Sequence, residues 1–245
     1  MKIIKLTYGM LSLALLWIAA CDDNPTRPEF EYEPEINVFG LLILDDAYPQ
    51  KTVKLERTYT IDEYFPNFRG IEDAVVMVRT EEQDVQFQHS FQGTYVDVND
   101  ELRLSAGTLY QLDVTLADGE KITSECVMPA RPTMISPAPN DQVPAYTALK
   151  LHWEETLFAQ QYAISVESDL ASFEFTLLSD STAASFFPFI FAGPGSYRAR
   201  ISALDQNYYD HARSRSNRNP ILHIEGAIGV FGAISFGKSV RFFAN

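Results

Sequence analysis

Basic residues are scarce in this sequence. Its 245 residues contain 19 lysines and arginines against 33 aspartates and glutamates, for a formal net charge of −14. A chain this acidic repels the phosphates of nucleic acids and anionic lipid head groups. The composition therefore argues against nucleic-acid binding, and we expect the charge to keep an exported protein soluble.

Motifs that signal catalysis are also lacking. The sequence has no Gly-x-Ser-x-Gly nucleophile elbow and no glycine-rich phosphate loop. Of its four histidines, His89 and His152 are expected on strand faces. His211 and His223 share one segment but lack the spacing of a zinc motif. We therefore predict a protein that is not an enzyme and holds no metal or cofactor.

One acidic loop has the oxygen ligands that calcium prefers. Asp97, Asn99 and Asp100 lie within four residues of one another, and Glu101 follows them. The spacing of a complete calcium loop is missing, which favours a polar β-turn. Calcium binding by Asp97, Asn99 and Asp100 stays open as the alternative.

No long apolar run follows the first twenty residues. The longest stretch of small and apolar residues, 226–237, is too short and too rich in glycine to span a bilayer. At the N-terminus, Lys2 and Lys5 precede a largely apolar stretch, 6–17, and small alanines follow it. This layout predicts that residues 1–20 are a secretory signal peptide. An uncut membrane anchor is the alternative, but the stretch is shorter than the roughly 20 residues a span needs.

The end of this signal resembles a bacterial lipobox. Residues 18–21 read Ile-Ala-Ala-Cys, and the lipobox cysteine becomes the acylated first residue of the mature protein. The resemblance implies that Cys21 carries acyl chains, palmitate among them, each buried methylene contributing about 0.8 kcal/mol to membrane binding. Cys126, the other cysteine, then has no disulfide partner. It shares a strand face with Ile122, and we predict a small buried hydrophobic residue.

Residues 21–34 are predicted to form a tether between the lipid and the first domain. They contain Pro25, Pro28 and Pro34 among acidic residues. Prolines stiffen a chain, so at about 3 Å per residue this segment extends over a few tens of Å.

Residues 35–129 are predicted to form an immunoglobulin-like β-sandwich. Short runs rich in branched residues recur between turns, and no helical period is sustained. The clearest signal is the alternation of apolar residues over 109–116, followed by the turn sequence Ala-Asp-Gly-Glu and a returning run, 122–128. Asp-Gly between two such runs is typical of a β-hairpin.

Residues 130–245 resemble a fibronectin type III module. The resemblance rests on strands around Trp153 and Tyr162 and on Tyr197, whose ring we expect in the core with its hydroxyl bonded to backbone, as in a tyrosine corner. An insertion, residues 205–225, interrupts the module, and Asp205 is predicted to cap a short helix in it. The predicted fold is therefore all-β: two tandem immunoglobulin-like β-sandwiches with a short helical insertion near the C-terminus.

Aromatic residues are concentrated in the segment 186–191 and in the insertion. The segment is predicted either to contribute to the second core or to form an exposed patch for a partner. The candidate interaction residues are Phe186, Phe187, Phe189, Phe191, Tyr208 and Tyr209.

Segments spread over residues 36–235 resemble two-domain lipoproteins of Bacteroidota that are classed only as a domain of unknown function. The matching segments are 70–78, 93–95, 110–112, 118–119, 123–124, 208–210, 219–220 and 224–232. The chain departs from the pattern at His223 and Ala227, where many relatives would carry Asn and Gly. The resemblance implies an outer-membrane location, lipid-anchored on the periplasmic or surface face, and a TonB-dependent transporter as a candidate partner. It implies no chemistry.

We therefore expect a non-enzymatic outer-membrane lipoprotein that assists a transporter or binds a ligand in a surface uptake system. The alternative is a glycan-binding or adhesive module, which exposed rings in a shallow groove would favour and buried rings would not. An enzyme would require a pocket that brings His211 and His223 together with Asp210 or Glu225.

Overall fold

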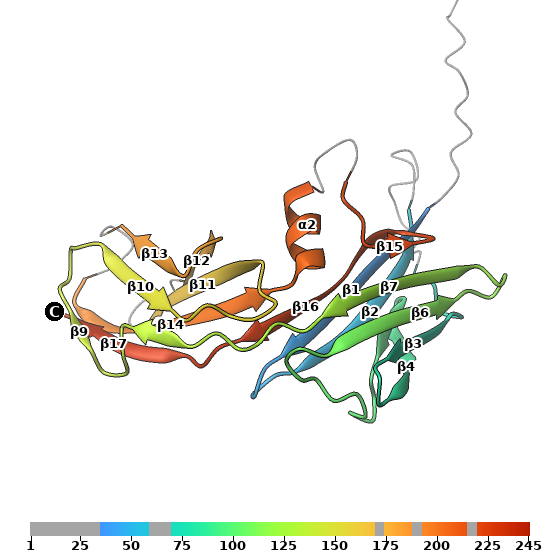
Figure 1. Ribbon diagram of the computed structural model, residues 1–245, viewed down its shortest axis with the longest axis horizontal. Coiled ribbons are helices and arrows are strands. Elements are labelled where there is room, and N and C mark those ends of the chain that lie inside the picture. The colour runs from blue at the N-terminus through green and yellow to red at the C-terminus, as the bar shows by residue number, and fades with distance from the viewer. Residues whose placement is uncertain (1–34, 59–69, 170–173, 188–192, 215–219) are drawn as a thin grey trace, which may run out of the picture. The chain divides into compact units, whose positions relative to one another are not determined.

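The computed structural model describes residues 35–58, 70–169, 174–187, 193–214 and 220–245 (Figure 1). These residues belong to one compact unit, Pro34–Asn245. In the described part of the chain, no helix is both long and apolar enough to cross a membrane. The predictions for the signal peptide, Cys21 and the tether concern residues 1–34, which lie outside the described residues.

The described residues are mostly β-strands, as predicted, and the all-β fold class is confirmed. The strands are β1 (Ile36–Leu44), β2 (Gln50–Arg57), β3 (Val75–Arg79), β4 (Asp84–Phe91), β5 (Thr94–Val96), β6 (Leu109–Thr115), β7 (Lys121–Val127), β8 (Met134–Ser136), β9 (Gln142–Val143), β10 (Leu149–Trp153), β11 (Gln161–Ser168), β12 (Glu174–Ser179), β13 (Ala183–Phe186), β14 (Gly195–Leu204), β15 (Ile224–Glu225), β16 (Ile228–Phe236) and β17 (Val240–Ala244). The helix is α2 (Gln206–Ser214), and it lies in the predicted insertion.

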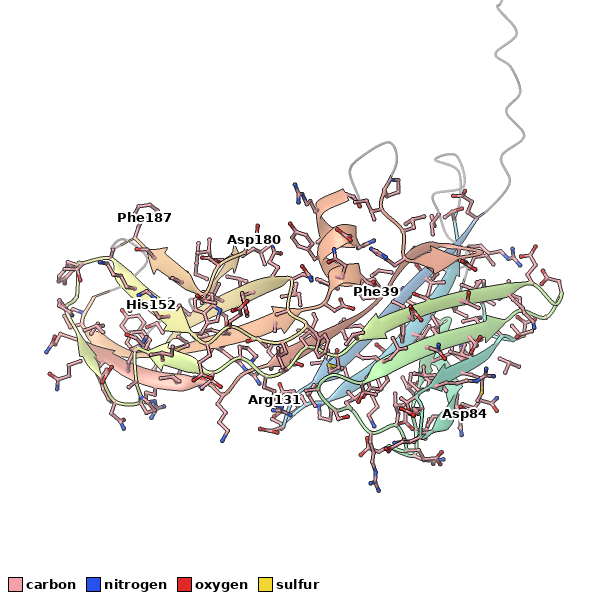
Figure 2. All side chains as sticks on the ribbon, viewed as in Figure 1. Phe39, Asp84, Arg131, His152, Asp180 and Phe187 are labelled. Atoms are coloured by element: carbon pink, nitrogen blue, oxygen red, sulfur yellow. The ribbon has the colours of Figure 1, made fainter. Side chains whose placement is uncertain are left out.

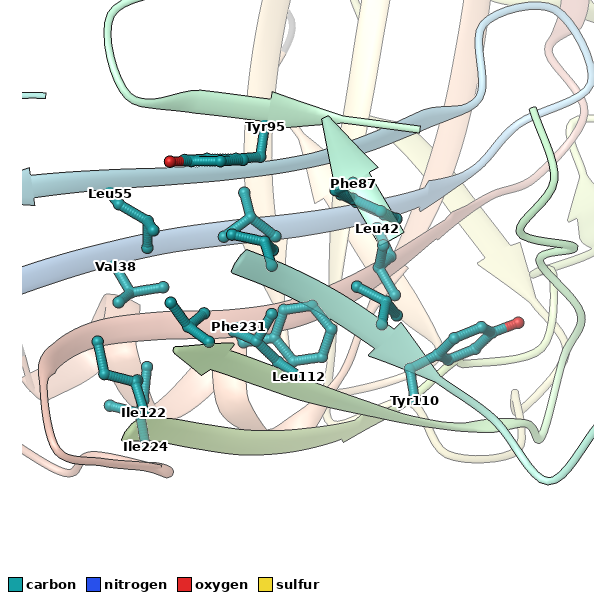
Figure 3. Packing of buried hydrophobic residues seen from close by; sticks show 14 of the residues in the cluster. Val38, Leu42, Leu55, Phe87, Tyr95, Tyr110, Leu112, Ile122, Ile224 and Phe231 are labelled. Carbon is teal, nitrogen blue, oxygen red and sulfur yellow. The ribbon is translucent and has the colours of Figure 1, made fainter. Parts of the chain in front are cut away.

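The first core lies between two layers of strands. One layer has the order β16-β1-β2-β5 and the other β3-β6-β7-β15, while β4 pairs with both β5 and β3 and so connects them. Figure 3 shows the side chains that fill this core, among them Leu42, Leu55, Phe87, Tyr110 and Phe231. All five are almost completely buried, which is the main source of stability in such a sandwich.

The β6–β7 hairpin follows directly from its sequence. Tyr110, Leu112 and Val114 point into the core and alternate with more exposed residues, as a period of two requires. Gly119 takes a positive φ of 92° in the connecting turn, where the amide of Leu116 donates to the carbonyl of Glu120 at 2.9 Å. The predicted hairpin is confirmed.

The second core lies between β12-β11-β14-β17-β9 and the three-stranded sheet β13-β10-β8. Tyr197 is buried there, stacked on Phe242 with ring centroids 5.8 Å apart, and its hydroxyl donates to the carbonyl of Gly193 at 2.6 Å. This geometry confirms the predicted tyrosine corner. Trp153 and Tyr162 are also buried, in edge-to-face contact at 5.3 Å.

Strand β16 joins the two sandwiches. It runs parallel to β1 from Asn37↔Ile228 to Leu44↔Ser235, and its last three residues pair antiparallel with β14. Three residues of the C-terminal region, Ile224, Phe231 and Ala233, therefore pack in the first core. Strand β16 begins at Ile228, within residues 130–245, which the sequence assigned to the second sandwich. The two-domain division at residue 129 stays a prediction.

Candidate ligand-binding cleft

A cleft of about 820 Å³ lies over the outer face of the first sandwich. Because alternate residues of β6 and β7 point to the core, the residues between them point outward and form the cleft floor. Gln111 stands opposite Glu125, and Asp113 opposite Thr123, which also pairs with Glu225 of β15. The start of α2, the segment 222–223 and the loop 158–160 form the walls.

Helix α2 is held over β7 and β16 by its first residues. Asp205 caps the helix, its Oδ1 accepting a hydrogen bond from the amide of Tyr208 at 2.9 Å, as predicted. The Nδ2 atom of Asn207 donates to the carbonyls of Glu125 and Phe231 at 2.6 and 2.8 Å. Gly232 permits this close approach, since a Cβ there would lie 3.2 Å from the Cβ of Tyr208.

The segment before β15 is fixed to α2 and β7 by polar contacts. Oδ2 of Asp210 lies 2.8 Å from Nε2 of His223 and accepts a hydrogen bond from Nε2 of Gln206 at 2.6 Å. The hydroxyl of Ser124 donates to the carbonyl of His223 at 2.6 Å. The structure thus pairs His223 with Asp210 and places His223 and Glu225 in one cleft, which does not include His211.

Burial controls the ionisation of two groups that line the cleft. It raises the pKa of Asp205, only 2% exposed, to about 7, although hydrogen bonds from backbone amides and the nearby His223 oppose the shift. Burial likewise raises the pKa of the Cys126 thiol well above its usual value, and the carboxylates of Asp205 and Glu125 add to this effect. Cys126 is a buried core residue, 3% exposed, as predicted, and burial favours its protonated thiol.

Phe158 lies at the edge of the cleft in an unusual backbone conformation. Its φ is +63°, and its ring is left 54% exposed. A left-handed conformation costs a bulky residue about 1–2 kcal/mol. Sequence analysis gave Phe158 no role, because neither its φ nor its position beside β6 can be read from the neighbouring residues.

The aromatic segment at the end of β13 does not form a continuous exposed surface in its described part. Phe186 is 1% exposed and packs edge-to-face on Phe175, with ring centroids 5.4 Å apart. It therefore belongs to the second core, and its assignment as a candidate interaction residue was wrong. Phe187 is 65% exposed at the end of the strand (Figure 2). Phe189 and Phe191 lie outside the described residues.

The two tyrosines of the insertion are half-buried on α2. The hydroxyl of Tyr209 accepts a hydrogen bond from Arg213 at 2.8 Å, and the guanidinium carbon lies 5.8 Å from the ring centroid. Neither Tyr208 nor Tyr209 lines the cleft. Of the predicted aromatic residues, the four that the structure describes do not line this cleft.

The acidic loop after β5 is organised around a lysine. Asp97 accepts hydrogen bonds from the amides of Glu101 and Leu102 at 3.0 and 2.8 Å and from Nζ of Lys51 at 3.0 Å. Lys51 also pairs with Asp100. Burial by itself would raise the pKa of Asp97, but these hydrogen bonds and the Lys51 charge together lower it by more, so the pKa lies below its ordinary value. The lysine ammonium supplies the positive charge here, which supports the polar-turn interpretation, and no cluster with metal-ligand character occurs within the described residues.

The described residues form an all-β fold with two β-sandwich cores, and the cleft lies on the outer face of the first. The family model described as Domain of unknown function (DUF4249) matches residues 24–239, and the chain belongs to this family. A search among functionally curated proteins finds no match.

Three of the solved structures that match this chain do so at low identity and low TM-score. The two-domain fibronectin type III segment of chicken tenascin has 8% identity and a TM-score of 0.29, covering 86% of this chain and 98% of its own. The FN1–FN3 domains of chicken CNTN1 have 11% identity and a TM-score of 0.33, covering 86% and 67%. The fibronectin(III)-like modules of Clostridium thermocellum CbhA have 12% identity and a TM-score of 0.31, covering 86% and 94%.

Proposed function

We propose that this protein is a non-enzymatic lipoprotein, anchored in the outer membrane through Cys21, that binds a ligand as an accessory component of a surface uptake system. The cleft over β6 and β7 carries the proposal. Its volume of about 820 Å³ lies in the range of about 300–1,000 Å³ that is typical of ligand sites. Its floor consists of side chains that the core does not use.

The chemistry of the cleft supports binding over catalysis. The Cys126 thiol is buried and protonated, and the proton of the Ser124 hydroxyl is directed to a backbone carbonyl. In the described part of the chain, the contact given for the His223 ring is with Asp210, and Ser124 bonds to the backbone carbonyl of His223, not to its ring. Activation of a nucleophile by a neighbouring base is what covalent catalysis requires.

The membrane anchor is supported by the basic, apolar and small-residue layout of residues 1–20 and the cysteine that follows. The test is replacement of Cys21 with serine in the full-length chain, followed by separation of membranes from soluble proteins. We expect the native protein in the membrane fraction and the Cys21→Ser variant largely outside it. A variant that remains wholly with the membranes contradicts the proposed anchor.

The transport role is tested by affinity purification from solubilised outer membranes. We expect a TonB-dependent transporter to co-purify with the native protein and not with a control lipoprotein expressed at the same level. Retention of a soluble glycan, with no transporter, favours the alternative of a glycan-binding module.

A further inference from the structure

The cleft floor changes character along β6 and β7. At one end Leu109 and Val127 stand opposite each other, and Phe158 lies nearby, its ring 3.4 Å from where a Cβ on Gly107 would be. At the other end Asp113, Thr123 and Glu225 form a row across three strands. A strand rises about 3.3 Å per residue, so the two ends are about 13 Å apart.

The apolar side chains at this end of the cleft are exposed to solvent and are not part of either hydrophobic core. Leu109, Phe158 and Leu222 all line the cleft and remain substantially exposed. Phe158 keeps its ring there in a strained backbone conformation, and such strain is concentrated at binding and catalytic sites. An apolar group of a ligand would cover this end.

Two carboxylates toward the polar end have no cationic partner: Glu225 in the end row, and Glu125 one row nearer the apolar end, opposite Gln111. Arg79 is 3.0 Å from Asp113, so that acid is compensated. Glu125 and Glu225, in contrast, form no ion pair with any described residue, and Lys121 lies one row beyond the cleft floor. Acidic groups in a cleft concentrate the field and attract cations.

We propose that the cleft binds a basic polypeptide segment in extended conformation. An apolar side chain contacts Leu109 and Phe158, a lysine or arginine four residues further on contacts Glu225, and Glu125 lies between these two contacts. The 13 Å between the two ends matches four residues of extended chain. This inference rests on the proposed ligand-binding role and specifies its ligand.

The same groups disfavour a saccharide. A saccharide hydroxyl can donate a hydrogen bond to Glu125 or Glu225, but it brings no charge to offset that of the carboxylate. A cationic side chain satisfies the carboxylates in charge as well as in hydrogen bonding.

The test is fluorescence anisotropy with the full-length lipidated protein in detergent and the labelled peptide Phe-Ser-Thr-Ser-Lys-Ser. We expect binding that weakens as salt increases from 50 to 500 mM, as screening requires. Peptides in which glutamine replaces lysine or serine replaces phenylalanine should bind more weakly. Equal binding of the glutamine peptide, or binding of maltohexaose in preference to every peptide, overturns the inference.

Variants locate the site. Glu125→Gln and Glu225→Gln should each weaken peptide binding by about twofold to fivefold, the range for solvent-accessible ion pairs. Phe158→Gly removes the ring and suits the positive φ, so it should weaken binding by about fivefold or more without loss of thermal stability. The matched control is Glu120→Gln in the β6–β7 turn, which should bind as the native protein does.

Unchanged affinity in all three cleft variants, each shown by circular dichroism to be folded, also overturns the inference. Failure of peptide binding with intact membrane anchoring and transporter co-purification refutes this inference alone. Peptide binding by a protein that fractionates as soluble refutes only the proposed anchor.

Discussion

The replacement Asp205→Asn should remove a pH dependence of stability that the native protein has. Asp205 is buried between β14 and α2, and its pKa is raised from 3.8 to about 7 by desolvation. The folded state therefore binds this proton more tightly than the unfolded state does. The resulting stabilisation is fully present below pH 3.8 and is lost as the pH rises through 7.

The magnitude follows from the two pKa values. At about 1.36 kcal/mol per pKa unit, the whole shift corresponds to about 4 kcal/mol. Between pH 5 and pH 8 the native protein should lose about 2–3 kcal/mol of this stabilisation. Asparagine keeps the side-chain oxygen that accepts the amide of Tyr208, and it is among the best helix N-caps. It does not titrate, so the variant should not show this loss.

The assay is urea unfolding of both proteins at pH 5, 6, 7 and 8, followed by tryptophan fluorescence and circular dichroism. Other titrating groups are common to both proteins, so the difference between their pH profiles isolates Asp205. Asp118→Asn in the exposed β6–β7 turn serves as the control and should follow the native profile. Identical pH profiles for Asp205→Asn and the native protein would refute the desolvation argument.

Four further substitutions test the packing, each by urea unfolding at a fixed pH. Gly229→Ala should lower the free energy of unfolding by more than about 3 kcal/mol, because the added Cβ would lie 2.0 Å from the carbonyl oxygen of Val38. Gly119→Ala is the control: Gly119 also has a positive φ but open space around it, so the substitution should cost about 1 kcal/mol. An equal effect of the two contradicts the close β1–β16 approach. Asn207→Ala should cost about 2–4 kcal/mol, because it leaves two carbonyls without their donor; a loss below 1 kcal/mol would show that water replaces the amide. Tyr197→Phe should cost about 1 kcal/mol by removing only the hydroxyl bond to Gly193, and no loss would argue against a tyrosine corner.

Several elements of the cleft were predictable because their signals are local. The β6–β7 hairpin follows from alternation and from Asp118-Gly119, and the start of α2 follows from the capping preference of Asp205. Alternation also implies which residues of β6 point outward. It does not say whether anything lies above them, and so the cleft itself was not foreseen.

The strands, the hairpin, the helix cap and the tyrosine corner were predictable, because each depends on residues within a few positions of one another. Three other features emerge only when the whole chain is folded: β16 lies parallel to β1, Phe186 is buried, and Glu125, Phe158 and Glu225 border one cleft. These features join residues that are far apart in the chain. Which of these residues meet depends on which surfaces remain to be covered once the local elements have formed. The pattern of residues along the sequence does not specify that choice.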